Sequence, residues 1–440
     1  MEGRTTFLRS ARVVRRAIAA TGLLASAAAL AQGADQDHLE HRLVAGESPY
    51  TLARDYLTSP NDYRAILTVN RLPDARRIPV GTVIRLPRRL LAWRAADLRI
   101  EAFSGQVTIN GQPAQRGMAV PEGARIVTGS NGFVSLRGNT GAVVTMPTNT
   151  QARLVRARIY RLDDLQDIEL QVLGGRGEAQ VPTLRPRERY RIGTPTTVSA
   201  VRGTVFRVGH DDSGERTVVE VVEGAVGTAA SGAEAVTGAG FGIAASPAGL
   251  LPQERLQPAP AITAPGAVQT GPEVAFAIAL PGEATGIRAQ IARDAGFTDI
   301  IGETIATGGA PAGFGNLADG RYFVRARAIS LSGIEGNSEI YSFRRKRLGA
   351  SAGAQPSPLE DGYRFAWLPE GAGETTYAFQ LWNTVRPAAL IVDETAMAAK
   401  GIVIAGLEPG TYEWRVAAMQ IDEDGLLQAW GPTQRLTVSE

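Results

Sequence analysis

The chain has 440 residues, of which 44% are hydrophobic and 20% charged, and it contains no cysteine. This length predicts two to four domains, and the absence of cysteine excludes disulfides and thiolate chemistry. With 50 glycines, 25 prolines and 6% aromatic residues, the composition indicates many turns and short strands. The formal net charge is +2; residues 1–31 hold five arginines and one glutamate, so the remainder carries −2. A nucleic acid is therefore not an expected partner.

Residues 1–31 have the pattern of a secretory signal peptide. The five arginines precede an apolar run from Ala17 to Ala31, which ends in the small-x-small sequence Ala29-Leu30-Ala31. Because this run is too short for a comfortable transmembrane span, we expect cleavage before Gln32 and export to the periplasm. An uncleaved anchor is the alternative. No cysteine follows the site, so a lipid anchor is not expected.

Residues 39–88 predict a small strand-helix-helix-strand unit. The segments GESPYTLA from Gly46, NRL from Asn70 and IPVGTVIRLP from Ile78 resemble the LysM family. The resemblance implies a βααβ fold that binds N-acetylglucosamine-containing glycans, and hence peptidoglycan, in a groove between two loops. The loop residues it implies for glycan binding are Gly46, Glu47, Ser48, Pro49, Leu72, Ile78 and Pro79. The alternative is that Gly46 and Gly81 serve only turn geometry.

Residues 97–245 predict an all-β domain, a β-roll or sandwich, from repeated short strands separated by glycine turns. Its most informative stretch is TPTTVSAVRGTVFRV, from Thr194 to Val208. We expect two strands hinged at Gly203, because an irregularity there shifts the phase of the alternation.

This stretch and the following VVEGAV resemble the FecR family, whose signature here is Arg202, Gly203, Thr204 and Phe206. The resemblance implies a periplasmic β domain that contacts other envelope proteins. FecR proteins of iron-citrate signalling also carry a cytoplasmic anti-sigma segment and a membrane span. We expect neither here, because a signal peptide precedes the first domain.

Residues 262–346 and 356–440 predict two related β-sandwiches. Leu317–Tyr322 matches Leu407–Tyr412 at an offset of 90 residues, and a repeat of this length made of short strands is typical of a sandwich. Each unit resembles a fibronectin type III domain of the immunoglobulin-like class. The inward-facing positions of the sixth strand should be Tyr322, Val324, Ala326 and Ala328, and then Tyr412, Trp414, Val416 and Ala418.

The sequence offers poor candidates for catalysis. The Gly-x-Ser-x-Gly match around Ser351 is expected to lie in a linker, and no histidine follows it to complete a triad. The three histidines, His38, His41 and His210, form no recognisable metal motif, so no metal or cofactor is expected. Surface ion pairs should join the acids of residues 163–169 to the arginines of 153–161. We expect Trp367 and Trp414 in the core and leave Trp382 open.

These observations favour a mainly β, multidomain protein that is not an enzyme. We expect a periplasmic cell-envelope protein that binds peptidoglycan through its LysM-like module and presents the FecR-like domain and two sandwiches to outer-membrane or periplasmic proteins. One alternative is a component of FecR-type signalling that acts with a receptor or an anti-sigma partner. Another is an accessory to an envelope hydrolase, which the shortage of histidine and cysteine disfavours.

Overall fold

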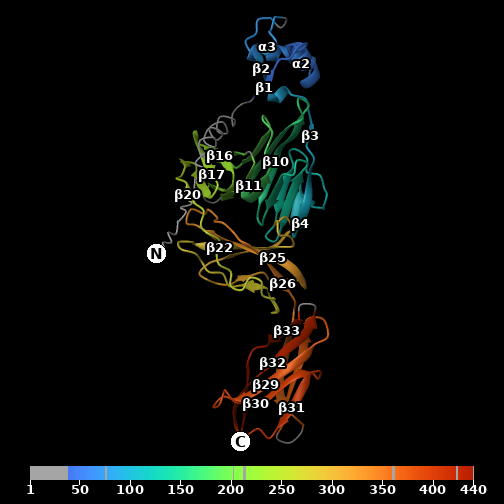
Figure 1. Cartoon of the computed structure of the whole chain (residues 1–440), viewed down its shortest axis with the longest axis vertical. Helices are drawn as coiled ribbons and strands as arrows, with labels where there is room; N and C mark the ends of the chain where they lie inside the picture. The colour runs from blue at the N-terminus through green and yellow to red at the C-terminus, as the bar shows by residue number, and fades with distance from the viewer. Residues whose placement is uncertain are drawn as a thin grey trace, which may run out of the picture.

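The computed structural model describes residues 38–74, 77–201, 203–211, 215–358, 362–422 and 425–439. The chain is mainly β, as predicted, and its four parts follow one another along an elongated molecule (Figure 1). The predicted cleavage site at Ala31 and the signature residue Arg202 lie outside the described residues. No helix within the described part is long and apolar enough to cross a membrane.

The N-terminal unit, residues 38–91, has the order strand, helix, helix, strand. It consists of β1 (His38–Arg42), α2 (Pro49–Tyr56), η1 (Pro60–Asp62), α3 (Tyr63–Val69), β2 (Val83–Pro87) and η2 (Arg88–Leu90). β1 and β2 pair antiparallel, with Arg42 opposite Val83. Leu52 and Ile66 pack on these strands in a core that Tyr160, Leu162 and Leu165 of the next domain complete. The unit is therefore seated on its neighbour rather than connected by a free linker.

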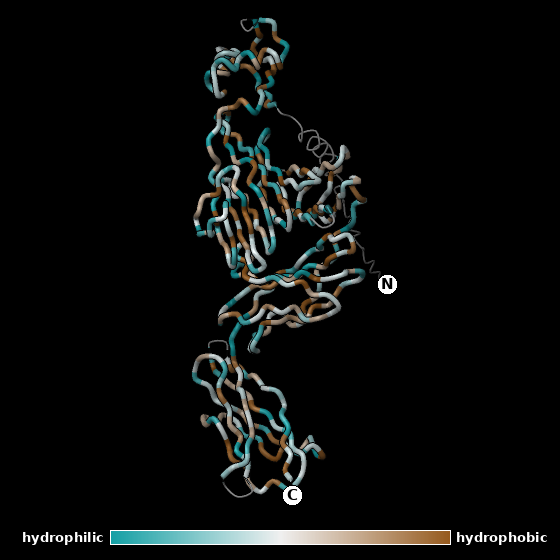
Figure 2. Tube along the Cα trace, turned by 180° about the vertical axis from the view of Figure 1, so that it is seen from behind, coloured by the Kyte–Doolittle hydropathy of each residue, from teal (hydrophilic) through white to brown (hydrophobic). Residues whose placement is uncertain are grey.

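The central β domain, residues 93–255, is built from two sheets that share strands. Its strands are β3 (Trp93–Ala95), β4 (Leu98–Ser104), β5 (Val107–Ile109), β6 (Gln112–Pro113), β7 (Arg125–Thr128), β8 (Phe133–Gly138), β9 (Val143–Met146), β10 (Gln151–Tyr160), β11 (Leu165–Val181), β12 (Arg189–Gly193), β13 (Val198–Val201), β14 (Thr204–Asp211), β15 (Arg216–Glu223), β16 (Ala225–Ala230), β17 (Ala233–Gly238), β18 (Phe241–Ser246), β19 (Gly249–Leu250) and β20 (Glu254–Arg255). Alternating hydrophobic and hydrophilic positions along these strands are visible in Figure 2. The hydrophobic positions form one core between the sheets.

Strand β11 crosses from one sheet to the other. Its first half pairs with β10 and β12, and its second half pairs with β9 and β14. The crossing is at Gly175, which has a φ of +85°, and a Cβ there would come within 2.6 Å of the Asn149 carbonyl oxygen. Only glycine fits so close an approach with this backbone conformation. The pair Gly174-Gly175 inside a strand pattern is the sequence signal for this crossing.

The first sandwich, residues 262–345, has a four-stranded sheet of order β23-β22-β25-β26 and a small sheet of β21 and β24. The strands are β21 (Ala275–Phe276), β22 (Gly286–Ala292), β23 (Ile300–Ala306), β24 (Ala312–Gly313), β25 (Gly320–Ile329) and β26 (Ile340–Arg345). The predicted inward positions of β25 are buried in its core, from Tyr322 to Ala328. The arginines between them, Arg325 and Arg327, are buried as well, because the opposite face of this sheet lies against the central β domain.

The second sandwich, residues 349–438, has a three-stranded sheet, β27-β28-β31, facing a sheet of β30-β29-β32-β33 with β34 added. The strands are β27 (Gly349–Pro356), β28 (Gly362–Glu370), β29 (Thr376–Asn383), β30 (Leu390–Met397), β31 (Gly401–Ala405), β32 (Gly410–Asp422), β33 (Gly425–Trp430) and β34 (Gln434–Val438). Trp367 and Trp414 lie in its core, as predicted. The Ala- and Gly-rich segment around Ser351 was expected to be a linker, but it forms β27, because Ser351 pairs opposite Leu368 of β28.

Candidate functional site

The predicted glycan-binding loops lie at the free end of the N-terminal unit. β2 runs from Val83 to Pro87, and the N-terminal unit contacts the central β domain through Arg88, just beyond β2, and through the Glu40 carbonyl of β1, which accepts a hydrogen bond from Arg187. The loop after β1 and the loop before β2 are therefore at the opposite end. They are joined there by a hydrogen bond of 2.8 Å from the Gly81 amide to the Leu43 carbonyl. Val44 and Val80 on these loops are 54% and 68% exposed.

The first loop is held in shape by its own side chains. Glu47 Oε2 accepts hydrogen bonds from the Val44 amide at 2.9 Å and lies 2.8 Å from His41 Nε2. Ser48 Oγ accepts a hydrogen bond from the Thr51 amide, which caps α2, and Pro49 occupies the first turn of that helix. Gly46 has a φ of +87° and open space around it. Glu47, Ser48 and Pro49 thus shape the loop, while its backbone and Gly46 stay accessible.

The predicted glycan-binding residues of the second loop lie partly in the core and partly on the surface. Leu72 and Ile78 are half-buried and pack against the core of the N-terminal unit, whereas Pro79 is exposed. Residues 75 and 76 between them lie outside the described part. Leu72 and Ile78 therefore have a packing role, and Pro79 and Val80 are the accessible part of this loop.

The described residues of the FecR signature lie where the chain changes sheet. β13 pairs with β12 and β16 in one sheet, and β14 pairs with β11 and β15 in the other. Gly203 between them has a φ of +73°. Before it Ser199 and Val201 are buried, and after it Thr204 and Phe206 are buried. The predicted phase shift at Gly203 is therefore present, and Phe206 is anchored in the domain core.

The acidic residue Asp167 is buried, which corrects the expectation that these acids form only surface ion pairs. It is fully inaccessible and accepts a 2.7 Å hydrogen bond from the Tyr160 hydroxyl. Arg88, from the N-terminal unit, and Arg156 lie 3.8 and 3.5 Å from the same oxygen, Oδ2. Burial, followed by the charge of Asp167, raises the pKa of Tyr160 to about 12. The ion pair is buried because the N-terminal unit covers this end of β11.

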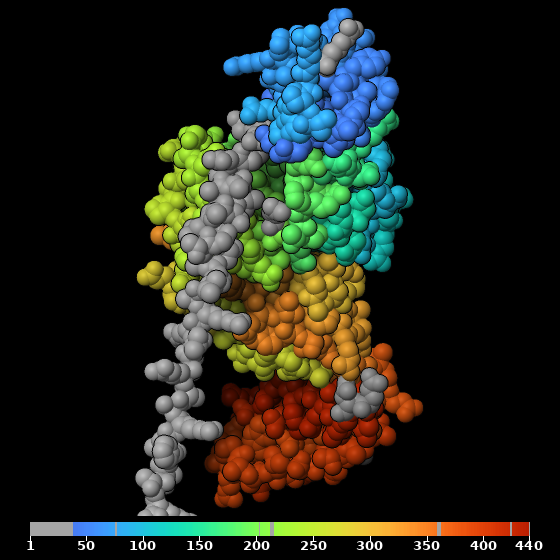
Figure 3. Space-filling view, turned by 45° about the horizontal axis from the view of Figure 1, so that its top comes forward, coloured from blue at the N-terminus to red at the C-terminus, as the bar shows by residue number. Residues whose placement is uncertain are grey.

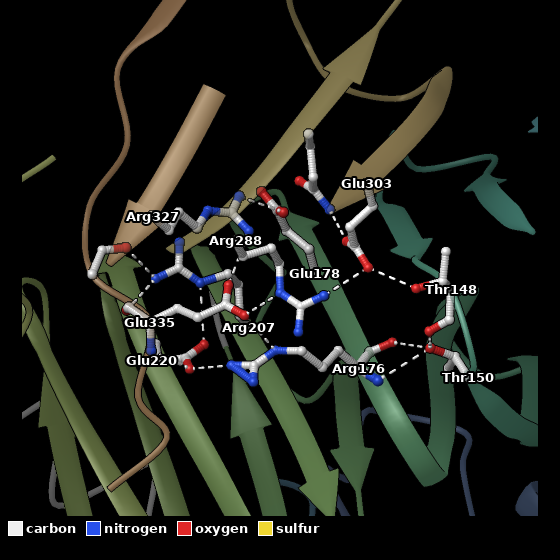
Figure 4. Close-up of polar contacts among 12 residues, drawn as sticks. Thr148, Thr150, Arg176, Glu178, Arg207, Glu220, Arg288, Glu303, Arg327 and Glu335 are labelled. Carbon is white, nitrogen blue, oxygen red and sulfur yellow. Dashed lines mark hydrogen bonds and ion pairs between the residues drawn. The ribbon is translucent and has the colours of Figure 1, made fainter. Parts of the chain in front are cut away.

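The central β domain and the first sandwich pack directly against each other (Figure 3). A buried set of charged residues, here called the interdomain network, joins them (Figure 4). It has five arginines and four glutamates among the described residues. The central β domain contributes Arg176, Glu178, Arg207 and Glu220, and the first sandwich contributes Arg288, Glu303, Arg325, Arg327 and Glu335. These residues lie on the outer faces of two sheets that oppose each other.

Strand pairing sets the order of charges on each face of the interdomain network. In the central β domain, Glu178 lies opposite Arg207, which in turn lies opposite Glu220. In the facing sheet of the first sandwich, Arg288 lies opposite Arg327. Glu178 receives hydrogen bonds from Arg325 at 2.8 Å and from Arg327 at 2.7 Å. Arginines of the sandwich face thus pair with a carboxylate of the central β domain.

Glu335, in the loop after β25, is the central acceptor of the network. It pairs with Arg288 at 2.6 Å and with Arg176 at 3.0 Å, so it bridges the two domains. Burial raises its pKa, but the facing guanidinium groups, Arg176 first, outweigh burial and hold the pKa well below its ordinary value. Removing one partner of a buried pair is costly, because a charge is left without compensation.

Two apolar clusters flank the interdomain network. Phe133 of β8 packs with Phe297 and Ile300 of the first sandwich, and Val218 of β15 packs with Ile334. Ser104 and Ser135 donate hydrogen bonds to the carbonyl oxygens of residues 300 and 298. The sequence pattern gave no sign of this interface, because the alternation in β25 marks only one face for burial.

The interface also contains two hollows. A cleft of about 550 Å³ is lined by Asn149, Gln151, Gly174, Gly175, Arg176, Gly209, His210, Asp211, Arg216, Val218, Arg288, Ser332 and Gly333. A smaller cavity of about 20 Å³ lies within the interdomain network, against Arg176, Glu178, Arg207, Arg288, Arg327 and Glu335. Arg176 and Arg288 line both hollows.

Trp382, whose exposure the sequence left open, is half-buried on the outer face of the second sandwich. The Arg415 guanidinium lies 5.8 Å from its ring centre and 4.2 Å from that of Trp430. These cation–π contacts pack Arg415 against Trp382 and Trp430 on the outer face of the strands. No cluster of three potential metal ligands occurs within the described ranges.

Comparison with known proteins identifies one family. Residues 124–227 match the FecR protein family, and this segment contains three of the positions, Gly175, Gly203 and Gly224, at which positive-φ glycines accompany a change of sheet. No curated protein matches the chain. The FecR assignment therefore covers part of the central β domain.

Solved structures resemble separate parts of the chain. A Parabacteroides distasonis protein described as an anti-sigma factor is 17% identical, with a TM-score of 0.26, over 30% of this chain and 59% of its own. The FN1–FN3 domains of chicken CNTN1 are 10% identical, with a TM-score of 0.24, over 61% and 99%. The fibronectin(III)-like modules of Clostridium thermocellum CbhA are 13% identical, with a TM-score of 0.19, over 41% and 94%. The chain thus spans about three fifths of the first of these structures.

Proposed function

We propose that this chain is a non-enzymatic protein of the periplasm that binds peptidoglycan through its N-terminal unit and presents its β domains to other envelope proteins. The observation that carries the proposal is the position of the predicted loops. They lie side by side at the free end of the unit, and their exposed apolar residues, Val44 and Val80, are not covered by the rest of the described chain.

Glycan recognition by these loops would use backbone groups and apolar contact. The loop backbones offer N–H and C=O groups to the hydroxyl and acetamido groups of N-acetylglucosamine. Val44 and Val80 offer contact to acetamido methyl groups, and the exposed ring of Tyr50, edge-on to Tyr63 at 6.0 Å, offers a surface to a sugar face. Such shallow contacts leave a small surplus after the entropy cost of association, so affinity should be modest.

The shape of the molecule suits a tether with a spacer. The N-terminal unit and the second sandwich lie at opposite ends of the chain (Figure 1). A glycan held at one end places the second sandwich away from the cell wall, where it can contact another protein. Ser351 lies inside a strand and lacks the strand-turn-helix context that the Gly-x-Ser-x-Gly motif of a nucleophile requires.

The test is sedimentation of the full chain with purified peptidoglycan sacculi. The full chain is needed because Tyr160, Leu162 and Leu165 complete the core of the N-terminal unit. We expect the wild type to pellet and the double variant Val44→Asp, Val80→Asp to lose at least about tenfold in binding, since each change costs apolar contact and adds a desolvated charge. Gly46 is left unchanged, because its positive φ would mix strain with binding.

The matched control places the same substitution at the other end of the molecule. Val385 in the second sandwich is 84% exposed, and Val385→Asp should pellet like the wild type. Wild-type protein that stays in the supernatant, or a loop variant that pellets equally well, would show that the N-terminal unit is a structural cap and not a tether.

The second candidate is a component of FecR-type envelope signalling, which the family match at residues 124–227 favours. In this role the β domains would contact a receptor or an anti-sigma partner. A neighbouring gene for a sigma factor or an outer-membrane receptor, together with altered transcription of that receptor when this gene is deleted, would support it. Unchanged transcription would favour the tether alone.

A further inference from the structure

The 20 Å³ cavity inside the interdomain network has room for one species the size of a water molecule or a monatomic ion. Its charged lining is unbalanced, with four arginines, Arg176, Arg207, Arg288 and Arg327, against two glutamates, Glu178 and Glu335. The whole network has five arginines and four glutamates among the described residues, an excess of one positive charge. A buried charge without compensation is costly, so this excess needs a partner.

One arginine that lines the cavity has a buried donor without a hydrogen bond. Arg327 is 4% exposed, and its Nε has no partner in the described structure, although its two Nη atoms bond to Glu178 and Glu335. Buried polar atoms are almost always satisfied by protein or by a bound species. The unpaired N–H and the excess charge are independent observations, and both belong to the interdomain network, of which Arg327 lines the cavity.

The pKa values of the arginines in the interdomain network are shifted in both directions: burial is outweighed by the facing carboxylates, which raise the pKa of Arg176 and of Arg327, whereas like charge contributes at two others. Burial, and next the charge of Arg327, lowers the pKa of Arg207 and of Arg325, that of Arg325 to about 10. In both cases a like charge adds to the effect of burial. An anion beside Arg327 would remove this repulsion.

We propose that the cavity binds one monatomic anion of the size of chloride, held by Arg327 and the guanidinium groups around it. The anion neutralises the interdomain network, and it therefore strengthens the contact between the central β domain and the first sandwich.

The test compares thermal unfolding of the full chain in sodium chloride, sodium bromide and sodium gluconate at equal ionic strength. Chloride and bromide fit the cavity and gluconate does not. Because an ion that binds only the folded state stabilises it by mass action, Tm should rise by about 3 °C for a tenfold increase in chloride above its Kd. Gluconate should give no such increase. Equal Tm values in the three salts would overturn the proposal.

Two isosteric variants at Thr145, which lines the cavity, test the charge argument. Thr145→Asp supplies a permanent negative charge and should abolish the difference between chloride and gluconate. Thr145→Asn has the same shape without the charge and should keep it. A chloride effect of equal size in both variants would place the ion elsewhere.

A direct readout does not depend on the variants. Crystals of the wild type grown in sodium bromide should give an anomalous difference peak in the cavity, beside Arg327 Nε. Ordinary density without an anomalous peak would identify a water molecule there and overturn the proposal.

Discussion

Gly203 is the residue at which the chain leaves one sheet of the central β domain for the other. Its φ of +73° lies in the left-handed region, which a side chain with a branched Cβ rarely adopts. A Cβ at this position would also meet Thr183 Oγ1 at 2.9 Å and Thr183 Cα at 3.2 Å. Glycine is therefore required at this signature position by the backbone conformation and by the close packing of Thr183.

We predict that Gly203→Val destabilises the full chain by at least about 2 kcal/mol, because left-handed strain and crowding add. Chemical denaturation followed by circular dichroism measures the change. The control is Gly238→Ala, where φ is not positive and no atom lies within 4 Å of the added Cβ, and we expect it to stay within about 0.5 kcal/mol of the wild type. Equal stability of Gly203→Val and the control would contradict the crossing geometry as the reason for this glycine.

Asp167 is a residue whose burial the sequence alone did not indicate. The acids of residues 163–169 and the nearby arginines correctly indicate ion pairs, and Arg187 pairs with Asp163 on the surface. Asp163 lies in the turn before β11, with a φ of +59°, whereas Asp167 lies within β11, where η2 of the N-terminal unit brings Arg88 over it. Burial at a joint between two units depends on how the units dock, and the alternation within β11 carries no information about docking.

At the scale of strands, acid should weaken the contact between β11 and β25. Burial raises the pKa of Glu178, but Arg325, then Arg327 and Arg207, outweigh burial and hold the pKa well below its ordinary value of 4.5. A carboxyl whose folded pKa is depressed stabilises the protein above its unfolded pKa, and this contribution decreases as pH falls below that value. We predict a loss of about 2 kcal/mol from Glu178 between pH 6 and pH 3.

The measurement is the free energy of unfolding against pH for the wild type and for Glu178→Gln. The variant lacks the titrating group, so its curve should be flatter over this range, by about the amount assigned to Glu178. The pH-independent loss in the variant reports the unpaired Arg325 and Arg327. Parallel curves for the two proteins would show that Glu178 does not titrate with folding.

The alternation of apolar and polar residues predicted most of the strands, and it predicted one buried face of each strand. The positions from Tyr322 to Ala328 in β25 and from Tyr412 to Ala418 in β32 are buried as the alternation indicated. The hinge at Gly203 is also present. The sequence did not indicate that Arg325 of β25 pairs with Glu178, which is 147 residues away. A charged residue opposite an apolar face is normally solvated, and only the docking of two sheets reverses this rule.

The interfaces between successive parts of the molecule differ in extent, and we expect this difference to appear in its thermal unfolding. The N-terminal unit, the central β domain and the first sandwich are joined by shared cores and by the interdomain network. The second sandwich is attached by fewer contacts, among them the ion pair of Arg344 with Asp422 and a hydrogen bond from Lys346 to the Ala372 carbonyl. Domains joined by small polar contacts behave independently, and those that share a large interface unfold together.

We therefore predict two calorimetric transitions for the full chain, one for residues 38–345 and one for residues 349–438. Trp414→Ala removes a buried ring from the core of the second sandwich and should lower only that transition, by at least about 12 °C, because a cavity of this kind costs about 3–5 kcal/mol in a domain of roughly 90 residues. Phe133→Ala, in the apolar cluster between the central β domain and the first sandwich, should lower only the other, by about 6 °C. A single transition that both substitutions lower would mean that the second sandwich is coupled to the rest, and the spacer would then be one rigid rod rather than a rigid body with an independent end.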